Sequence, residues 1–156
     1  MQWVLMLALE NIHRQTGGPF AAAIFREETG EMIAAACNQV VPAHCSIAHA
    51  EMLAIALAQQ QLQTHDLSSN GIRYQLVSSA EPCAMCSGAL PWAGISSLVF
   101  GASKTDVEAT GFDEGSKPDN WIEHLQDRGI AVYPNILSSK AADVLGQYST
   151  FGGTLY

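Results

Sequence analysis

The spacing of apolar positions along the chain predicts alternating helices and strands. Apolar residues three and four apart over several turns are typical of a helix, and short apolar runs between turn residues are typical of strands. By these criteria we expect helices at residues 3–15, 48–62, 83–90, 121–128 and 139–148. We expect strands at residues 20–26, 32–37, 72–79, 95–100 and 130–133, and an acidic loop at residues 102–120.

This order of elements predicts a single α/β domain over residues 1–156. The first two strands are joined by a short turn that contains Thr29 and Gly30, so they form an antiparallel hairpin. Helices separate the later strands, and such βαβ passages make parallel pairs with right-handed crossovers. The fold class that follows is a three-layer α/β/α sandwich around a five-stranded mixed sheet.

Composition favours a folded domain without a membrane span. The chain is 48% hydrophobic and 14% charged, which is too apolar for a disordered protein. No apolar run reaches the roughly 18 residues that a membrane-spanning helix needs. The apolar start at residues 1–9 lacks the basic flank and the cleavage site of a signal peptide. We therefore expect a cytoplasmic protein with no membrane partner, in which thiols stay reduced.

Charge narrows the class of partner. Seven Lys and Arg residues against fifteen Asp and Glu residues give a net charge of −8 at pH 7. Affinity for a nucleic-acid backbone comes largely from Lys and Arg side chains that neutralise phosphates. We therefore expect no nucleic-acid partner, and an uncharged or cationic small molecule as the ligand.

Two separated motifs carry the chemistry. His49 precedes Glu51 by two residues, and Cys83 and Cys86 stand three apart after Pro82. Two cysteines on one helical turn point the same way, so both sulfurs can reach one metal ion while the histidine supplies a third bond. Three protein ligands leave one tetrahedral position open, which is typical of a catalytic zinc site. We predict that His49, Cys83 and Cys86 bind Zn²⁺.

Glu51 completes this arrangement. It lies beside the predicted zinc ligands without being needed as one, so its carboxyl group is free to accept and deliver a proton. Both motifs begin predicted helices, where the positive end of the helix dipole favours a thiolate. Two other interpretations compete: a redox-active Cys83–Cys86 pair, and a zinc module without catalytic activity.

The joint His-x-Glu and Pro-Cys-x-x-Cys pattern resembles the zinc-dependent cytidine deaminase superfamily. The resemblance implies the cytidine deaminase-like fold, zinc on His49, Cys83 and Cys86, and Glu51 as the catalytic proton shuttle. It also implies the reaction, in which water activated by zinc replaces an amino group on a ring carbon and ammonia leaves.

Further residues are similar to one branch, the nucleobase and tRNA-adenosine deaminases. Residues 17–24 and Asn38 match its opening, and the asparagine holds the base in that branch. Residues 111–114 and the tail that ends at Tyr156 look most like bacterial guanine deaminases and related aminotriazine and nucleoside deaminases. The resemblance implies a homodimer in which residues 145–156 are exchanged, with Tyr156 over the partner's pocket.

The expected reaction is therefore the conversion of guanine to xanthine and ammonia. Asp113 or Glu114 would accept the N–H donors of guanine, and the sequence does not choose between them. Backbone N–H groups at Ala50 and Cys83 could steady the substrate. Two aromatic rings, those of Phe20 and Trp92, could stack on the base or fill the core.

Other substrates stay open at this point. The same zinc chemistry would deaminate cytosine, a nucleoside or an aminotriazine such as ammeline. A tRNA adenosine deaminase also fits the motifs, although the acidic charge of the chain argues against it.

Overall fold

The computed structural model describes residues 1–156 as six helices and five strands. The helices are α1 (Gln2–His13), α2 (Ala50–Leu62), α3 (Ala84–Ala93), α4 (Lys104–Ala109), α5 (Trp121–Gln126) and α6 (Ser138–Thr150). The strands are β1 (Ala21–Arg26), β2 (Met32–Cys37), β3 (Tyr74–Ala80), β4 (Ser97–Ala102) and β5 (Ala131–Tyr133). None of the helices combines the length and the apolar character that crossing a bilayer requires.

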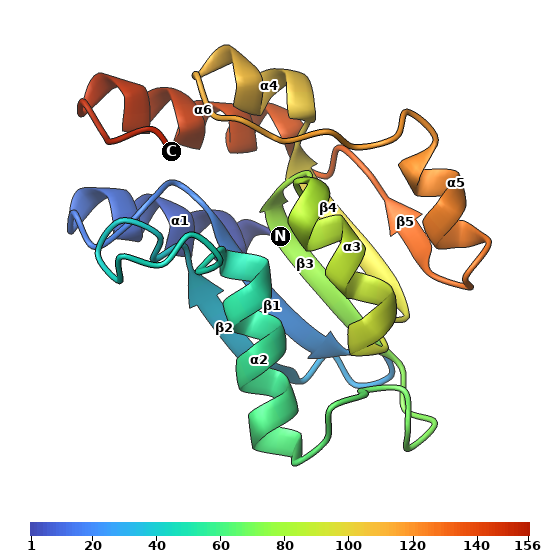
Figure 1. Ribbon diagram of the computed structural model, residues 1–156. Coiled ribbons are helices and arrows are strands. Elements are labelled where there is room, and N and C mark those ends of the chain that lie inside the picture. The colour runs from blue at the N-terminus through green and yellow to red at the C-terminus, as the bar shows by residue number, and fades with distance from the viewer.

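The five strands form one mixed sheet, as predicted. Their order is β2-β1-β3-β4-β5, in which β1 runs antiparallel to both β2 and β3. The pairs β3–β4 and β4–β5 are parallel, because helices carry the chain back between these strands. The parallel strands β3 and β4 both end at the edge of the sheet from which the turn into α3 departs (Figure 1).

Helices cover both faces of the sheet, so the sandwich has three layers (Figure 1). Successive strand residues face opposite sides. Ala22 and Ile24 therefore pack with buried residues of α2, α3 and α5, whereas Ala21 and Ala23 pack with those of α1, α4 and α6. The strands contribute apolar residues to both clusters, which fits a sheet buried on both faces.

The stretch predicted as a loop at residues 102–120 contains helix α4, so that part of the prediction was wrong. A capping box starts the helix: the Ser103 hydroxyl oxygen accepts the Asp106 N–H, and Asp106 Oδ2 accepts the Ser103 N–H. This exchange satisfies backbone donors that have no partner within the helix. The Ser-x-x-Asp spacing was the sequence signal for it.

Helix α3 also extends past its predicted end at Leu90. It includes Pro91 and ends at Ala93, where Gly94 adopts a left-handed conformation (φ 72°). Proline near a helix end removes few backbone hydrogen bonds, so here Gly94 and not Pro91 terminates the helix.

Replacing Ser103 with alanine is expected to lower the free energy of unfolding by about 1 kcal/mol, because the capping hydroxyl is lost. Chemical denaturation of the purified protein measures this change. Ser116→Ala is the matched control, since Ser116 is exposed outside any helix. Equal unfolding free energies for the two variants would contradict a stabilising role for the capping box.

Candidate active site

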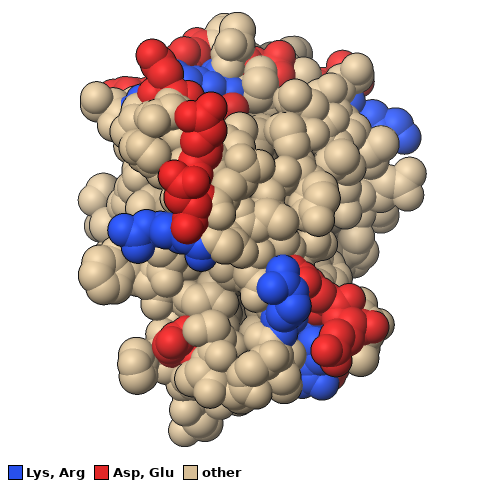
Figure 2. Space-filling view, turned by 90° about the vertical axis from the view of Figure 1, so that its right-hand side faces the viewer, with Lys and Arg blue, Asp and Glu red and all other residues tan.

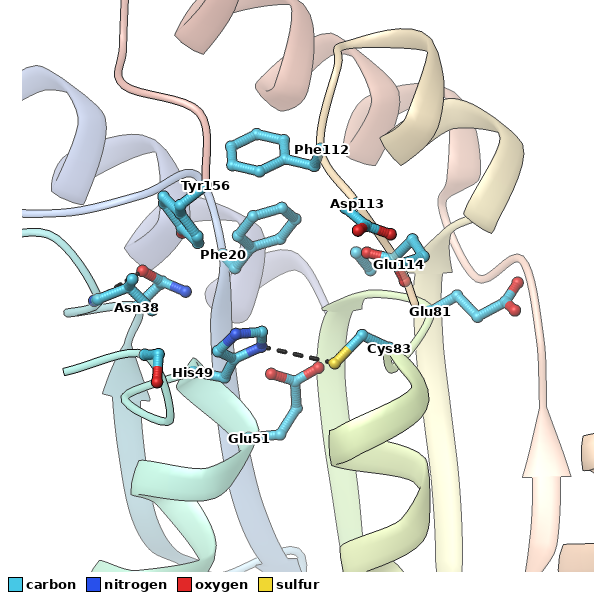
Figure 3. A pocket seen from close by; sticks show the side chains of 13 residues that line it. Phe20, Asn38, His49, Glu51, Glu81, Cys83, Phe112, Asp113, Glu114 and Tyr156 are labelled. Carbon is cyan, nitrogen blue, oxygen red and sulfur yellow. Dashed lines mark hydrogen bonds between the residues drawn. The ribbon is translucent and has the colours of Figure 1, made fainter. Parts of the chain in front are cut away.

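Two helix N-termini bring the chemistry-bearing residues together. His49 is the N-cap of α2 and Cys83 is the N-cap of α3, and both have extended backbone conformations. Neither side chain makes a capping hydrogen bond to its own helix. Both side chains instead point toward each other across the space between the helices (Figure 3).

The three predicted zinc ligands lie at distances that suit one metal ion. The Nδ1 atom of His49 is 3.6 Å from the sulfur of Cys83 and 3.6 Å from the sulfur of Cys86. The three ligand atoms all lie within 4.8 Å of one another. At zinc bond lengths of roughly 2.0–2.1 Å to nitrogen and 2.3 Å to sulfur, two ligands at tetrahedral positions are about 3.5 Å apart. The arrangement therefore fits zinc with little movement of its ligands.

The electrostatics of the cluster favour the charged form of the Cys83 thiol. The hydrogen bond from Cys86 is the main cause that lowers the pKa of Cys83 to about 4. The same contact, together with burial, raises the pKa of the Cys86 thiol. The hydrogen bond to Cys83 also raises the pKa of His49. The cluster thus holds a thiolate at neutral pH, and a thiolate is the form of cysteine that binds metal.

Glu51 lies in the first turn of α2, with its carboxyl group between His49 and Cys83 (Figure 3). The residue is 6% exposed, and burial raises the pKa of its carboxyl group. The hydroxyl of Ser78 on β3 donates a hydrogen bond to Glu51 Oε1 at 3.3 Å. A carboxyl group with a raised pKa holds a proton more readily than an exposed one, which suits a group that takes up and releases a proton during a reaction.

These groups form the floor of a pocket of about 240 Å³. This volume is below the roughly 300–1,000 Å³ of sites for drug-sized ligands, so it suits a small ring. The lining residues are Phe20, Asn38, Val40, Ser46, His49, Glu51, Ala80, Glu81, Cys83, Phe112, Asp113, Glu114 and Tyr156.

The structure distinguishes the two neighbouring acids of the 111–120 loop. Asp113 is exposed, and its Oδ1 accepts the N–H of Gly115. Glu114 is 6% exposed, and its Oε2 is buried without a hydrogen-bond partner. Burial, followed by the nearby charges of Cys83 and Glu51, raises the pKa of Glu114 to about 8. Of the two, Glu114 is the acid with an unused acceptor inside the pocket.

Asn38 and aromatic rings line the rest of the pocket. Asn38 is 1% exposed; its Oδ1 accepts the N–H of Val40, and its amide nitrogen faces the pocket (Figure 3). The rings of Phe20 and Phe112 meet edge to face with centroids 4.9 Å apart. Phe20 therefore lines the pocket at the position where a base could stack.

Tyr156 lines the pocket above His49, next to Phe20 (Figure 3). The Tyr156 ring lies edge to face with Phe112, with centroids 5.2 Å apart, and its buried hydroxyl has no hydrogen-bond partner. A Cβ atom on Gly18 would lie 2.2 Å from that hydroxyl oxygen, so any larger residue at this position would displace the Tyr156 ring. The structure describes one chain, and its tail lies in its own pocket; exchange of the tail between two chains stays a prediction.

Two of the substrate-contacting residues named from the sequence, Trp92 and Ala50, lie outside the pocket lining, as does the predicted zinc ligand Cys86, which is fully buried. Trp92 is 83% exposed on the far end of α3 and lines a separate hollow with Trp121. Ala50 is fully buried at the first position of α2. The sequence reasoning in turn missed Val40, Ser46, Ala80 and Glu81 as lining residues. For Ala80 and Glu81, their position directly before the Pro-Cys motif was the available signal.

Comparison with known proteins identifies the relatives of this chain. Residues 1–102 match the family described as the cytidine and deoxycytidylate deaminase zinc-binding region. A guanine deaminase from Bacillus subtilis is 37% identical over 127 residues, which cover 81% of this chain and 78% of the relative. A probable cytosine deaminase from Schizosaccharomyces pombe is 34% identical over 116 residues, which cover 74% and 67% of the two chains.

A solved structure has the same fold over nearly the whole chain. The guanine deaminase from Nitrosomonas europaea superposes with a TM-score of 0.93 at 51% sequence identity. The match covers 96% of this chain and 82% of that one. The five-stranded α/β fold expected from the sequence is thereby confirmed.

Proposed function

Because the chain belongs to the cytidine and deoxycytidylate deaminase zinc-binding family, we propose that it hydrolyses free guanine to xanthine and ammonia. One observation carries the proposal: the metal cluster and an unused acceptor lie at the same pocket. His49 Nδ1 is 3.6 Å from the sulfurs of both Cys83 and Cys86. Glu114 lines the pocket, and its Oε2 is buried without a hydrogen-bond partner. The guanine deaminase relatives support the choice of substrate.

Residues of this chain supply the proton transfers. Zinc held by His49, Cys83 and Cys86 would supply an activated water molecule as the nucleophile. Glu51 takes a proton from that water and delivers one to the ring nitrogen beside the attacked carbon. Glu51 then assists the departure of the amino group, so one water is consumed and one ammonia is released for each guanine. The contact from Ser78 keeps the Glu51 carboxyl in place.

The walls of the pocket suit a purine base. Guanine presents its ring N–H and its amino group as neighbouring donors. Such donors favour the ionised form of a carboxyl group, so they counteract the burial that raises the pKa of Glu114 in the free protein, and Glu114 can accept them as a carboxylate. The Asn38 amide can contact the opposite edge of the base, and the rings of Phe20 and Tyr156 line the pocket, where a flat base can pack against them.

Glu114→Gln is expected to raise KM for guanine by about tenfold or more, because hydrogen bonds to a charged group contribute about 1.5–3 kcal/mol. Asp113→Asn is the matched control and is expected to leave KM nearly unchanged, since Asp113 is exposed. Steady-state ammonia release at varied guanine concentration measures both values. A larger rise in KM for Asp113→Asn than for Glu114→Gln would show that Asp113, and not Glu114, recognises the base.

A panel of candidate substrates tests the proposed reaction. Guanine, cytosine, ammeline and guanosine are each incubated with zinc-loaded protein, and ammonia is measured. We expect guanine to have the highest kcat/KM and guanosine to be nearly inert, because the pocket is small and Tyr156 takes up part of its lining. An inert guanine alongside rapid turnover of another compound would refute the substrate assignment.

The distribution of charge argues against tRNA as the substrate. Five of the seven Lys and Arg residues pair with a carboxylate; the pairs are Arg14–Glu10, Arg26–Glu31, Arg73–Glu27, Lys104–Glu108 and Lys117–Glu81. On the face shown in Figure 2, basic side chains lie beside acidic ones and form no broad basic field. Few cations are therefore left to neutralise phosphates.

We also propose that the protein is a single-domain cytoplasmic enzyme that works as a homodimer. All four cysteines are free thiols, which fits a reducing compartment. Exchange of residues 145–156 between the two copies would place each Tyr156 over the partner's pocket. Analytical ultracentrifugation tests the dimer, and a monomer at micromolar concentration would exclude tail exchange.

A further inference from the structure

Lys117 is a buried lysine at the junction of two segments that shape the pocket. Its side chain is 2% exposed, and its ammonium lies 2.6 Å from Glu81 Oε1 and 2.6 Å from the carbonyl oxygen of Pro82. The same ammonium lies over the ring of Trp121, 4.2 Å from its centroid. A lysine is rarely buried in this way unless its charge is paired.

Glu81 is held on both of its carboxylate oxygens. Oε1 accepts from Lys117, and Oε2 accepts the backbone N–H of Lys104 at 3.1 Å. Its side chain turns away from the centre of the pocket, although the residue stands two positions before Cys83 (Figure 3). Glu81 and Pro82 therefore form a fixed site that binds the Lys117 ammonium, and this contact holds the loop of residues 112–117 against the Glu81–Pro82 turn.

A second contact joins the same two segments. The N–H of Ala84, at the start of α3, donates to the carbonyl oxygen of Glu114 at 3.0 Å. Gly115 follows in a left-handed conformation (φ 69°), and a Cβ atom there would lie 3.2 Å from the Cβ of Ala84. The loop is thus hydrogen-bonded to the first turn of α3 at Glu114 and to the Glu81–Pro82 turn at Lys117, with only two residues between the two contacts.

We propose that Lys117 is a positioning residue that fixes residues 112–117 against the Glu81–Pro82 turn, so that the Glu114 carboxyl faces the pocket beside the zinc ligands. The inference rests on the proposed function, because it assigns Glu114 to the binding of the base. A buried ion pair is weak support for stability in itself, but removing one partner leaves a buried charge alone. The pair instead specifies where the loop lies.

Two variants test this role. Lys117→Met removes the ammonium and keeps an apolar stem against Trp121. The double variant Glu81→Gln/Lys117→Met also removes the carboxylate charge that would be left unpaired, and it stays informative where the single variant folds poorly. Lys104→Met is the matched control, since Lys104 pairs with Glu108 at the surface and its contact with Glu81 is through the backbone.

Three measurements distinguish a role of Lys117 in positioning the loop from a general loss of folding or zinc binding. We expect KM for guanine to rise by about tenfold to a hundredfold in both test variants, with kcat nearly unchanged, since the loss of hydrogen bonds between the base and a charged group has an effect of this size. We expect one zinc ion per chain throughout, and faster amide hydrogen exchange at residues 112–116 than in wild type. Lys104→Met is expected to match wild type in all three.

Wild-type KM and wild-type exchange at residues 112–116 in the double variant would overturn the proposal. Loss of zinc, or a lowered kcat with unchanged KM, would also overturn it, because the pair would then serve the zinc motif and not the loop. The exchange measurement needs no substrate. Failure of the parent protein to deaminate guanine would therefore refute the proposed function, and the effect of Lys117 on the position of residues 112–117 would remain testable by exchange.

Discussion

Glu51→Gln is expected to reduce kcat for guanine by about 10³–10⁴-fold while zinc stays bound at one ion per chain. Glutamine has nearly the same shape as glutamate, but it cannot accept and deliver a proton. The carboxyl group of Glu51 is buried between His49 and Cys83, and burial raises its pKa. Ammonia release and metal analysis on the same preparation measure the two quantities.

Ser78→Ala provides a graded comparison for that experiment. It removes only the hydrogen bond to Glu51 Oε1, so we expect a smaller loss of kcat than in Glu51→Gln. Retained affinity for guanine in Glu51→Gln, measured as an equilibrium Kd, would show that binding survives the loss of turnover. A wild-type rate in Glu51→Gln would contradict the proton-shuttle role.

Removal of zinc by a chelator is expected to abolish deamination and to lower the melting temperature. A ligand that binds only the folded state stabilises it by about 2.7 kcal/mol when its concentration is a hundred times its Kd. Cys83→Ser is expected to have the same two effects, because Cys83 supplies the thiolate of the cluster. Calorimetry with and without added zinc measures the difference in stability.

Cys45→Ser is the matched control for the zinc experiment, since Cys45 is outside the candidate metal cluster. We expect it to keep zinc, activity and melting temperature. Restoration of activity in the chelated protein by added zinc would complete the test. Full activity after chelation, with no metal detected, would contradict a zinc-dependent reaction.

The sequence predicts the order of elements well because apolar periodicity is a local property. The antiparallel hairpin and the two parallel pairs follow from the length of the connections, and the structure has both. The convergence of His49 with Cys83 and Cys86 was also predictable, since each motif begins a helix after a strand of the same sheet. Helix α4 was missed because six residues carry little periodic signal.

The walls of the pocket were less predictable than its floor. Asp113 and Glu114 are adjacent in the sequence. Which of them turns inward depends on the backbone of the loop, on the hydrogen bond from Ala84 to Glu114 and on the hydrogen bond from Lys117 to Pro82. Tyr156 was named only through a resemblance, because no local pattern shows where a chain terminus will pack. Trp92 looked suitable for stacking by residue type, but its helix directs it into solvent.

Anomalous diffraction at the zinc absorption edge, on crystals of the zinc-loaded protein, tests the central claim most directly. The account predicts one strong peak within bonding distance of His49 Nδ1 and the sulfurs of Cys83 and Cys86, with the Glu51 carboxyl beside the ion and not bonded to it. A peak bound elsewhere on the chain, or Glu51 in place of one of these three ligands, would contradict it.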